Sequence, residues 1–409
     1  MSLMKNIKKV LGGDLRQYTM VVALIALLIY FNYINPVSRG KMITSSNFQN
    51  LLSGNAYVLV LAIGMLMVIV IGQIDLSVGS VAAFSSMAMA IAAKQWSLPW
   101  WVAVLLALLI GALAGAWHGF WIAKLGIPGF ITTLGGMMIF RGGVIWISKS
   151  ISVPAPEQLK IFGAGYLPEW GPNTGLNNST LLLGIIAIAA FSILQFRKKK
   201  RMEELTGEEE ELWPVIVRII LVGAVISFLT WIFGTGREGT SFPIPGLILV
   251  VLVLIYDTVT QRTRFGRHIY AVGGNKSAAA LSGVNVPKTY FLTMLNMSVL
   301  AAIAGIMFVG RSTAAGPSDG TGWELDAIAS VFIGGAAVSG GIGTVTATMV
   351  GGLVMAVLNS GLMLMGVGAD RTQVVKGLVL LAAVAFDVYN KKAGRKSIIG
   401  NWFPDSKDK

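Results

Sequence analysis

Few ionisable side chains lie within the long apolar segments of this sequence, and those few could contact a substrate or an ion. Asp75 lies in the stretch IDLSVGS at 74–80, where two apolar segments meet, and Glu324 and Asp326 open a later segment. Placing an ionised side chain at membrane depth costs free energy, so residues of this kind are candidates for a transport pathway. The alternative is structural, since Asp and Ser side chains also cap helix starts. We favour capping for these acids and keep substrate contact as the second interpretation.

The candidates for a transport pathway or gate are these acids and some small or polar residues: Asp75, Ser77, Gly79, Glu324, Asp326 and Asn359. Arg141, Lys376 and Asp387 also lie in or near apolar segments. They are available for ion pairs, although the sequence does not say which pairs form. No segment carries the series of acids and histidines that a proton-coupled carrier needs. Secondary transport is therefore disfavoured, but it stays open.

Catalytic and metal-binding motifs are absent from the sequence. It has no GxxxxGK[ST] phosphate-binding loop, so we expect no ATP hydrolysis by this chain, and it has no HExxH or GxSxG. With no cysteine and only His118 and His268, we predict no metal site. His118 lies on a glycine-rich face, and we interpret it as a packing or interfacial residue. A membrane-embedded enzyme is therefore the third-ranked function.

The composition is that of a membrane protein. Hydrophobic residues make up 55% of the 409 residues and charged residues 12%, with a mean hydropathy of +0.72. A soluble domain carries roughly twice that share of charge. The apolar residues fall into blocks of about 17–25 residues, which is the length that crosses the hydrocarbon core as a helix. The net charge of +13 could indicate a nucleic-acid partner, but basic loops on the cytoplasmic side of a membrane explain it better.

These blocks predict an all-α polytopic membrane protein with about 10–12 transmembrane helices, some of them broken or re-entrant, in a single transmembrane domain over 1–409. The first block begins near Tyr18 with no small-residue cleavage site after it, so we take it as a retained span. The candidate spans are 18–34, 56–72, 79–95, 98–123, 127–148, 181–196, 213–233, 245–260, 289–310, 324–341, 344–365 and 373–389.

Basic residues orient these spans. Threading the chain from a cytoplasmic N-terminus puts the four main basic groups on one side, as the positive-inside rule requires. Both termini are therefore predicted to be cytoplasmic. The four groups are Lys5 to Arg16, Arg197 to Arg201, Arg262 to Arg267, and Lys391 to Lys396.

Three polar stretches connect the spans. Residues 149–180, rich in Pro, Gly and Asn, are predicted to form an ordered external loop. Residues 197–212 change from RKKKR to a run of glutamates and are predicted to be a solvated cytoplasmic linker, with a specific partner contact as the minority interpretation. Residues 261–288 are predicted to form a third, cytoplasmic segment.

Glycine spacing points to helix packing. Gly111, Gly115 and Gly119 repeat every four residues, so they share one helix face and let another helix approach closely. Four glycines at 334–341 interrupt the span at 324–341 and predict a broken or re-entrant helix with freed carbonyls. A weak repeat relates the region from Ala62 to Val81 to the region from Ala327 to Val345, and chance could supply it.

Four ordered motifs give the sequence a family resemblance. They are IDLSVGS at 74–80, GRHIYAVGGN at 266–275 with LSGVNV at 281–286, ELDAIAS at 324–330 with GGAAVSGGIGT at 334–344, and VKGLVLLAAVAFD at 375–387. With them the chain resembles, over nearly its whole length, the permease subunits of bacterial ABC monosaccharide importers. Within that group it looks most like the xylose or multiple-monosaccharide permeases.

The resemblance implies a division of labour. A homodimer of this chain would form a sugar pathway across the bacterial inner or plasma membrane, in contact with lipid. Two ABC ATPase subunits would bind ATP-Mg, so this chain would bind no cofactor itself, and an extracytoplasmic sugar-binding protein would deliver the monosaccharide. The direction, import, comes from the resemblance alone.

The resemblance also assigns residues 266–288 to a coupling helix that docks on the ATPase. Small residues let such a helix seat closely, and Gly273 and Gly274 are expected to act as hinges. Relatives often carry an acidic residue before the alanines, where this chain has Lys276 and Ser277, so its docking contact differs in detail. The predicted coupling residues are Gly266, Arg267, Tyr270, Gly273, Gly274, Asn275, Ala278, Ala279, Leu281, Ser282 and Gly283.

Overall fold

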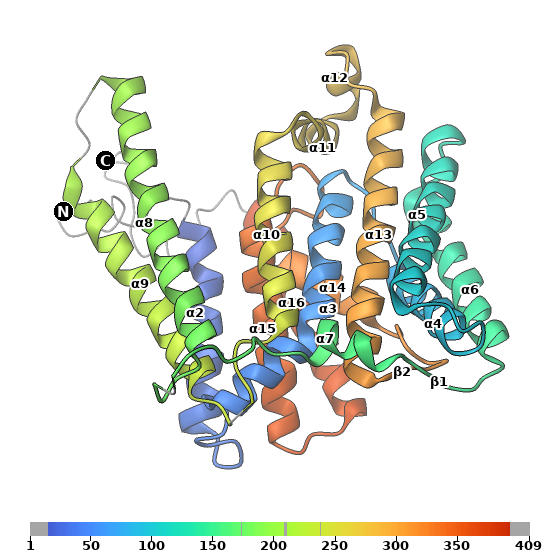
Figure 1. The fold of residues 1–409 in the computed structure, drawn as a ribbon. Helices are drawn as coiled ribbons and strands as arrows, with labels where there is room; N and C mark the ends of the chain where they lie inside the picture. The colour runs from blue at the N-terminus through green and yellow to red at the C-terminus, as the bar shows by residue number, and fades with distance from the viewer. Residues whose placement is uncertain (1–14, 173, 208–210, 238, 393–409) are drawn as a thin grey trace.

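The computed structural model describes residues 15–392, apart from residues 173, 208–210 and 238. Over these residues the chain is almost entirely helical (Figure 1), and its strands are β1 (Val153–Pro154) and β2 (Ala314–Ala315), an antiparallel pair. Within this described part of the chain, eight helices are long and apolar enough to cross a membrane. The predicted all-α, multi-pass architecture is confirmed.

Each predicted span corresponds to a helix. The first helix, α2, continues as the π-helical turn η1 (Tyr30–Ile34), and α3 begins 11 residues before its predicted start at 56. The span helices are α2 (Leu15–Ile29), α3 (Ser45–Val70), α4 (Val78–Lys94), α5 (Trp100–Lys124), α6 (Gly129–Ser148), α8 (Asn178–Thr206), α9 (Leu212–Gly234), α10 (Ile244–Arg262), α13 (Val286–Ser312), α14 (Trp323–Ile333), α15 (Val345–Leu364) and α16 (Ala369–Lys392).

Two of these helices begin inside the protein after a non-helical entry. The 11 residues of α14 extend about 16 Å, roughly half of the hydrocarbon core. The predicted span 324–341 therefore ends at Ile333, and 334–344 is non-helical. Gly335, Gly340 and Gly341 have positive φ there, a backbone conformation that residues other than glycine rarely adopt. Helix α4 has 17 residues and follows the non-helical residues 71–77.

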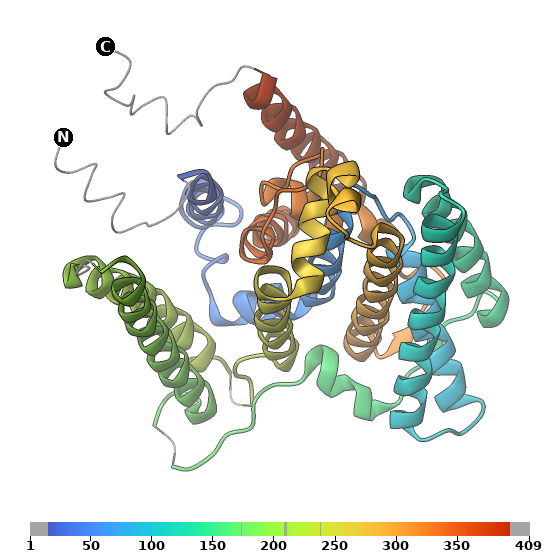
Figure 2. The same ribbon diagram turned by 90° about the horizontal axis from the view of Figure 1, so that it is seen from above.

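The core surrounds α3, where all residues from 58 to 70 are buried. Helix α13 packs against α3, and α5 packs against the other side of α13 (Figures 1 and 2). The three spaced glycines of α5 lie in that second contact. A methyl group on Gly115 would lie 2.5 Å from Leu295 Cα, and one on Gly111 would lie 2.7 Å from Ala302 Cβ. Gly119 lies similarly close to Phe291.

Helices α8 and α9 form a hairpin that stands beside the main bundle (Figure 2). Most of its apolar side chains are exposed on the protein, including Ile185, Leu194 and Phe228, as expected of helices that face lipid. Its contacts with the bundle include a hydrogen bond from Gln49 Nε2 to Phe233 O, at 3.3 Å.

The predicted charged linker 197–212 is largely helical. Helix α8 continues to Thr206, through the whole RKKKR run, and ends where Gly207 N donates to Glu203 O at 2.9 Å. Lys199 pairs with Glu203 one turn later, which supports the extension. Glu208 to Glu210 lie outside the described residues. The end of α8 and the end of α10 lie at the same end of the molecule (Figure 1), as a cytoplasmic position for the basic groups at both ends requires.

The predicted loop 149–180 is ordered by short elements at the opposite end of the bundle. It contains β1, the 3₁₀ turn η2 (Glu157–Leu159) and α7 (Lys160–Ala164), and it ends at Asn177, which caps α8. Gly163 of α7 lies against Gly310 and Arg311 at the end of α13. The loop therefore covers this end of the core.

Substituting Gly115 with Ala should destabilise the protein by about 1–3 kcal/mol, because the added methyl group meets backbone atoms that cannot swing away. Gly135 of α6 is the control, since a methyl group there has no neighbour within 4 Å. Thermal denaturation of both variants in detergent checks this expectation. Equal melting temperatures would show that the contact between α5 and α13 is not tight.

Candidate functional site

The first candidate site is the place where the N-termini of α4 and α14 meet inside the bundle. A methyl group on Gly79 would lie 2.1 Å from Gly320 O and 2.7 Å from Glu324 Oε2. Trp323, the first residue of α14, contacts Tyr57, with ring centroids 4.4 Å apart. Tyr57 is the thirteenth of the 26 residues of α3, so the junction lies level with the middle of this long apolar helix.

Asp75 organises the entry into α4. Its Oδ1 accepts hydrogen bonds from Ser77 N at 2.8 Å and Ser77 Oγ at 2.6 Å. The predicted capping role is therefore met only in part, because Asp75 holds the turn before the helix and the Ser77 side chain makes no cap hydrogen bond to α4. Asp75 is fully buried, and its Oδ2 has no hydrogen-bond partner among the described residues.

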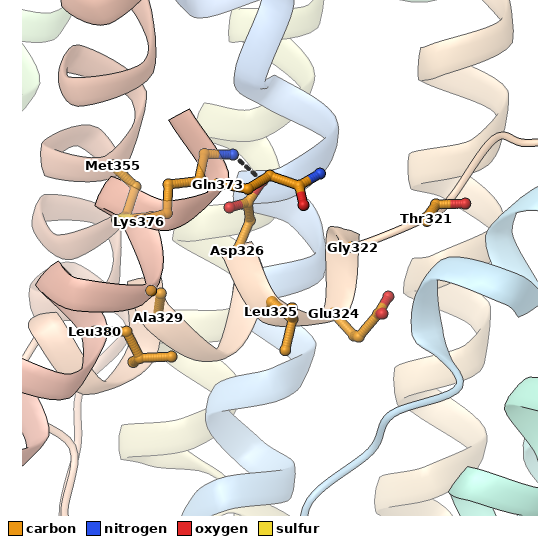
Figure 3. Close-up of a pocket in the computed structure, with 11 residues that line it drawn as sticks. Thr321, Gly322, Glu324, Leu325, Asp326, Ala329, Met355, Gln373, Lys376 and Leu380 are labelled. Carbon is orange, nitrogen blue, oxygen red and sulfur yellow. Dashed lines mark hydrogen bonds and ion pairs between the residues drawn. The ribbon is translucent and has the colours of Figure 1, made fainter. Parts of the chain in front are cut away.

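Asp326 binds Lys376 instead of capping α14. Its Oδ2 lies 2.9 Å from Lys376 Nζ, and this ion pair joins α14 to α16 (Figure 3). The capping interpretation is wrong for Asp326, which lies one full turn into the helix, too far along to reach the free N–H groups at its start. Arg141 of α6 instead donates from Nη1 to Asp319 O, at 2.5 Å. The side chain of Asp387 lies outside the described residues.

Glu324 points to the other side of the start of α14, away from Asp326 (Figure 3). Its Oε2 is buried against Gly79 and has no hydrogen-bond partner among the residues that the structure describes. Asn359, the remaining predicted pathway residue, lies on α15 and does not line the pocket described next.

A cavity of about 340 Å³ lies between α14, α15 and α16, beside the ion pair (Figure 3). Its polar lining comes from Thr321, Glu324, Asp326, Gln373 and Lys376, and its apolar lining includes Leu325, Ala329, Met355 and Leu380. The sequence did not single out Thr321 or Gln373, because neither is charged and only the fold brings their segments together. The pocket offers both hydrogen-bond donors and acceptors beside an apolar surface.

The second candidate site is the predicted coupling segment, which folds as α11 (Arg264–Gly274) and α12 (Lys276–Leu281). The end of α11 is tightly packed. A methyl group on Gly273 would lie 1.7 Å from Val70 O, the last carbonyl of α3, and Gly341 N donates to that same carbonyl at 2.8 Å. Tyr270 Oη donates to Gly343 O at 2.6 Å. Gly273 therefore makes a close backbone contact, and its expected role as a hinge stays a prediction.

These contacts join α11 to the chain segments next to α4 and α14, the two helices that start inside the protein and are called half-helices below. Val70 leads directly into residues 71–77 and α4, while Gly341 and Gly343 belong to the segment between α14 and α15. Burial raises the pKa of the Tyr270 hydroxyl, and the charge of Asp257 adds to that effect. Tyr270 therefore stays a neutral hydrogen-bond donor.

Helix α12 projects from this end of the molecule (Figure 1). Asn275 caps it by accepting from Ala278 N at 2.9 Å, and Ala279 is buried. Leu281 at its end is 91% exposed, which is unusual for leucine on a surface predicted to face water. The Lys276 ammonium lies 5.5 Å from the centre of the Tyr290 ring.

The remaining predicted coupling residues flank α11 and α12. Gly266 lies against Thr260 O, and Arg267 donates to Arg262 O at 3.2 Å. Ser282 and Gly283 turn the chain towards α13, whose first turn is capped by Asn285. Ala278, Asn275 and Gly274 lie around the start of α12.

His118 of α5 is fully buried, between Trp117 and Phe140. Its ring nitrogens have no hydrogen-bond partner among the described residues. Within that part of the chain, no group of three His, Cys, Asp or Glu residues could hold a metal ion.

The comparisons with known proteins decide the family. The family described as branched-chain amino acid transport system / permease component matches residues 47–384. The chain belongs to this permease family. It is 34% identical to the xylose transport system permease protein of Haemophilus influenzae over 94% of the chain and 99% of that protein.

Two other relatives extend this picture. The chain is 35% identical to the xylose transport system permease protein of Escherichia coli, over 93% of each chain. It is 32% identical to the ribose import permease protein of Escherichia coli, over 90% of the chain and 93% of that protein. No solved structure matches significantly. The resemblance to the permeases of monosaccharide importers is confirmed.

Substituting Gly273 with Ala should separate α11 from α3, because the added methyl group would overlap the Val70 carbonyl, at a cost of about 1–3 kcal/mol. The neighbouring Gly274→Ala variant is the matched control, since a methyl group there has no neighbour within 4 Å. Melting temperatures in detergent should fall only for the first variant. A loss of the same size in both would contradict the packing described here.

Proposed function

We propose that the chain is the membrane-spanning permease of an ATP-driven importer for a monosaccharide such as xylose. The observation that carries this proposal is the 34–35% identity to two xylose permeases over 93–94% of the chain. The family description names branched-chain amino acids, but the relatives at 32–35% identity reported above, which match 90% or more of this chain, are named for xylose and ribose. Sugar is therefore the better-supported substrate class.

The proposed importer needs partners. Two ATPase subunits would bind ATP-Mg and hydrolyse the nucleotide, and an extracytoplasmic binding protein would deliver the sugar to a homodimer of this chain in a bacterial inner membrane. This chain would supply the passage and the docking surface. The exposed Leu281 on a short helix of otherwise small residues supports docking at α12, because it can fill an apolar cleft on a partner.

A mechanical link from α12 to the middle of the membrane supports coupling. Movement of α12 would be passed to α11, and from there through Gly273 to the end of α3 and through Tyr270 to the segment between α14 and α15. Both half-helices are connected to these parts of the chain. ATP-driven closure of the partner subunits would thus reorient the junction of α4 and α14, provided that the nucleotide binds the two states with different affinities.

The runner-up is an ion-coupled carrier. The buried, unpartnered oxygens of Asp75 and Glu324 favour it, because a cation or proton could occupy such acids. It requires no ATPase.

Uptake of labelled xylose, arabinose, galactose, glucose and ribose, in cells with and without the gene, tests the proposal. The measurement is repeated after the ion gradients are collapsed while ATP is maintained. An ATP-driven importer continues to take up its sugar under these conditions. Gene-dependent uptake that stops with the gradients would establish the ion-coupled carrier instead, and no gene-dependent uptake of any of these sugars would contradict the substrate class.

Leu281→Asp should abolish ATP-driven uptake and co-purification of the ATPase, because a charge replaces the apolar contact at the end of α12. The free energy of unfolding of the permease itself should change by no more than about 0.5 kcal/mol, since the side chain is almost fully exposed. Its melting temperature should therefore stay nearly the same. Leu281→Met keeps the apolar character and should retain uptake. Normal uptake by the aspartate variant would rule out docking through Leu281.

A further inference from the structure

We infer that the pocket between α14, α15 and α16 is the place where this permease holds the sugar during passage, with Asp326, Lys376 and Gln373 binding its hydroxyl groups. The inference rests on the proposed function and adds a binding site to it. Three features of the pocket carry it: its chemistry, its volume and its place in the fold.

The polar side chains of the pocket match a sugar. Hydroxyl groups both donate and accept hydrogen bonds, and the pocket offers an ammonium group, a carboxylate and an amide on one side of the start of α14 (Figure 3). Asp326 and Lys376 neutralise one another at 2.9 Å. A neutral ligand can therefore exchange hydrogen bonds with the pair without adding an unbalanced charge, whereas an ionic ligand would have to break it.

The pocket also has an apolar lining. Leu325, Met355 and Leu380 can cover the C–H face of a sugar ring. The volume of about 340 Å³ lies at the lower end of the range for small-molecule sites, roughly 300–1,000 Å³. It therefore suits a monosaccharide better than a larger saccharide.

The place of the pocket connects it to the moving parts. Thr321 and Gly322 lead into α14, whose start meets α4, and the far end of α14 leads to the segment that contacts α11. Reorientation of α14 would alter the distance between Asp326 and Lys376, because these residues lie on different helices. Sugar affinity would then change with the conformational state, as transport requires.

Single cysteines test the assignment directly, because the chain has no cysteine of its own. Gln373→Cys and Leu380→Cys place thiols in the pocket. Each variant permease, assembled with its ATPase subunits in nanodiscs, is treated with a water-soluble methanethiosulfonate in the absence and presence of D-xylose or D-ribose. Sugar at about ten times its Kd should slow labelling about tenfold, since only the empty pocket reacts.

Ala369→Cys is the matched control, because it lies exposed at the start of the same helix α16. It should react at one rate with or without sugar. Pocket thiols that react at equal rates with and without sugar, or that never react, would overturn the assignment. If wild-type uptake of the same sugar is normal in that case, the proposed function stands and only the pocket assignment fails. Absence of gene-dependent uptake would remove the proposed function itself.

Discussion

The structure depends on one constraint: a helix that starts within a membrane exposes backbone N–H groups that lipid cannot satisfy. Helices α4 and α14 both start inside the bundle, and both pack against longer helices. Asp75 supplies part of the missing hydrogen bonding at the start of α4, because its Oδ1 accepts from Ser77 N. The chain segments that lead into α4 and α14 can therefore exist only in the interior of the protein, where α13 packs against α4 and α3 packs against α14.

The same constraint explains why glycine is frequent at the junctions. Gly79 and Gly320 bring two backbones within contact distance, and Gly273 and Gly341 do the same at the C-terminal end of α3. Close backbone contacts of this kind transmit displacement well, because no flexible side chain lies between the moving parts. A shift at α11 would therefore reach two half-helices together, which gives the proposed transport cycle a physical route from the partner subunits to the membrane centre.

Charge is used sparingly inside this bundle. The ion pair of Asp326 and Lys376 lies beside a cavity, at side-chain exposures of 17% and 22%, where it keeps some access to solvent or ligand. Buried pairs of this kind add little stability, because desolvation offsets their attraction. The proposed contact with a sugar would give this pair a function besides stability. Helix α8, by contrast, keeps its charges beyond its apolar part, where mainly apolar side chains are exposed.

The sequence by itself determined the class of the protein, all twelve apolar segments and the break near Gly334, because hydropathy, length and glycine clusters are local properties. Its motifs also identified the family. The helical continuation of α8 was missed because the charges suggested a linker, whereas the pairing of Lys199 with Glu203 supports helix. Only the tertiary structure decided that Asp326 pairs with Lys376, 50 residues away, and that Gly273 packs on Val70. Such contacts depend on how distant helices are placed side by side, and nothing in the local spacing of residues encodes that placement.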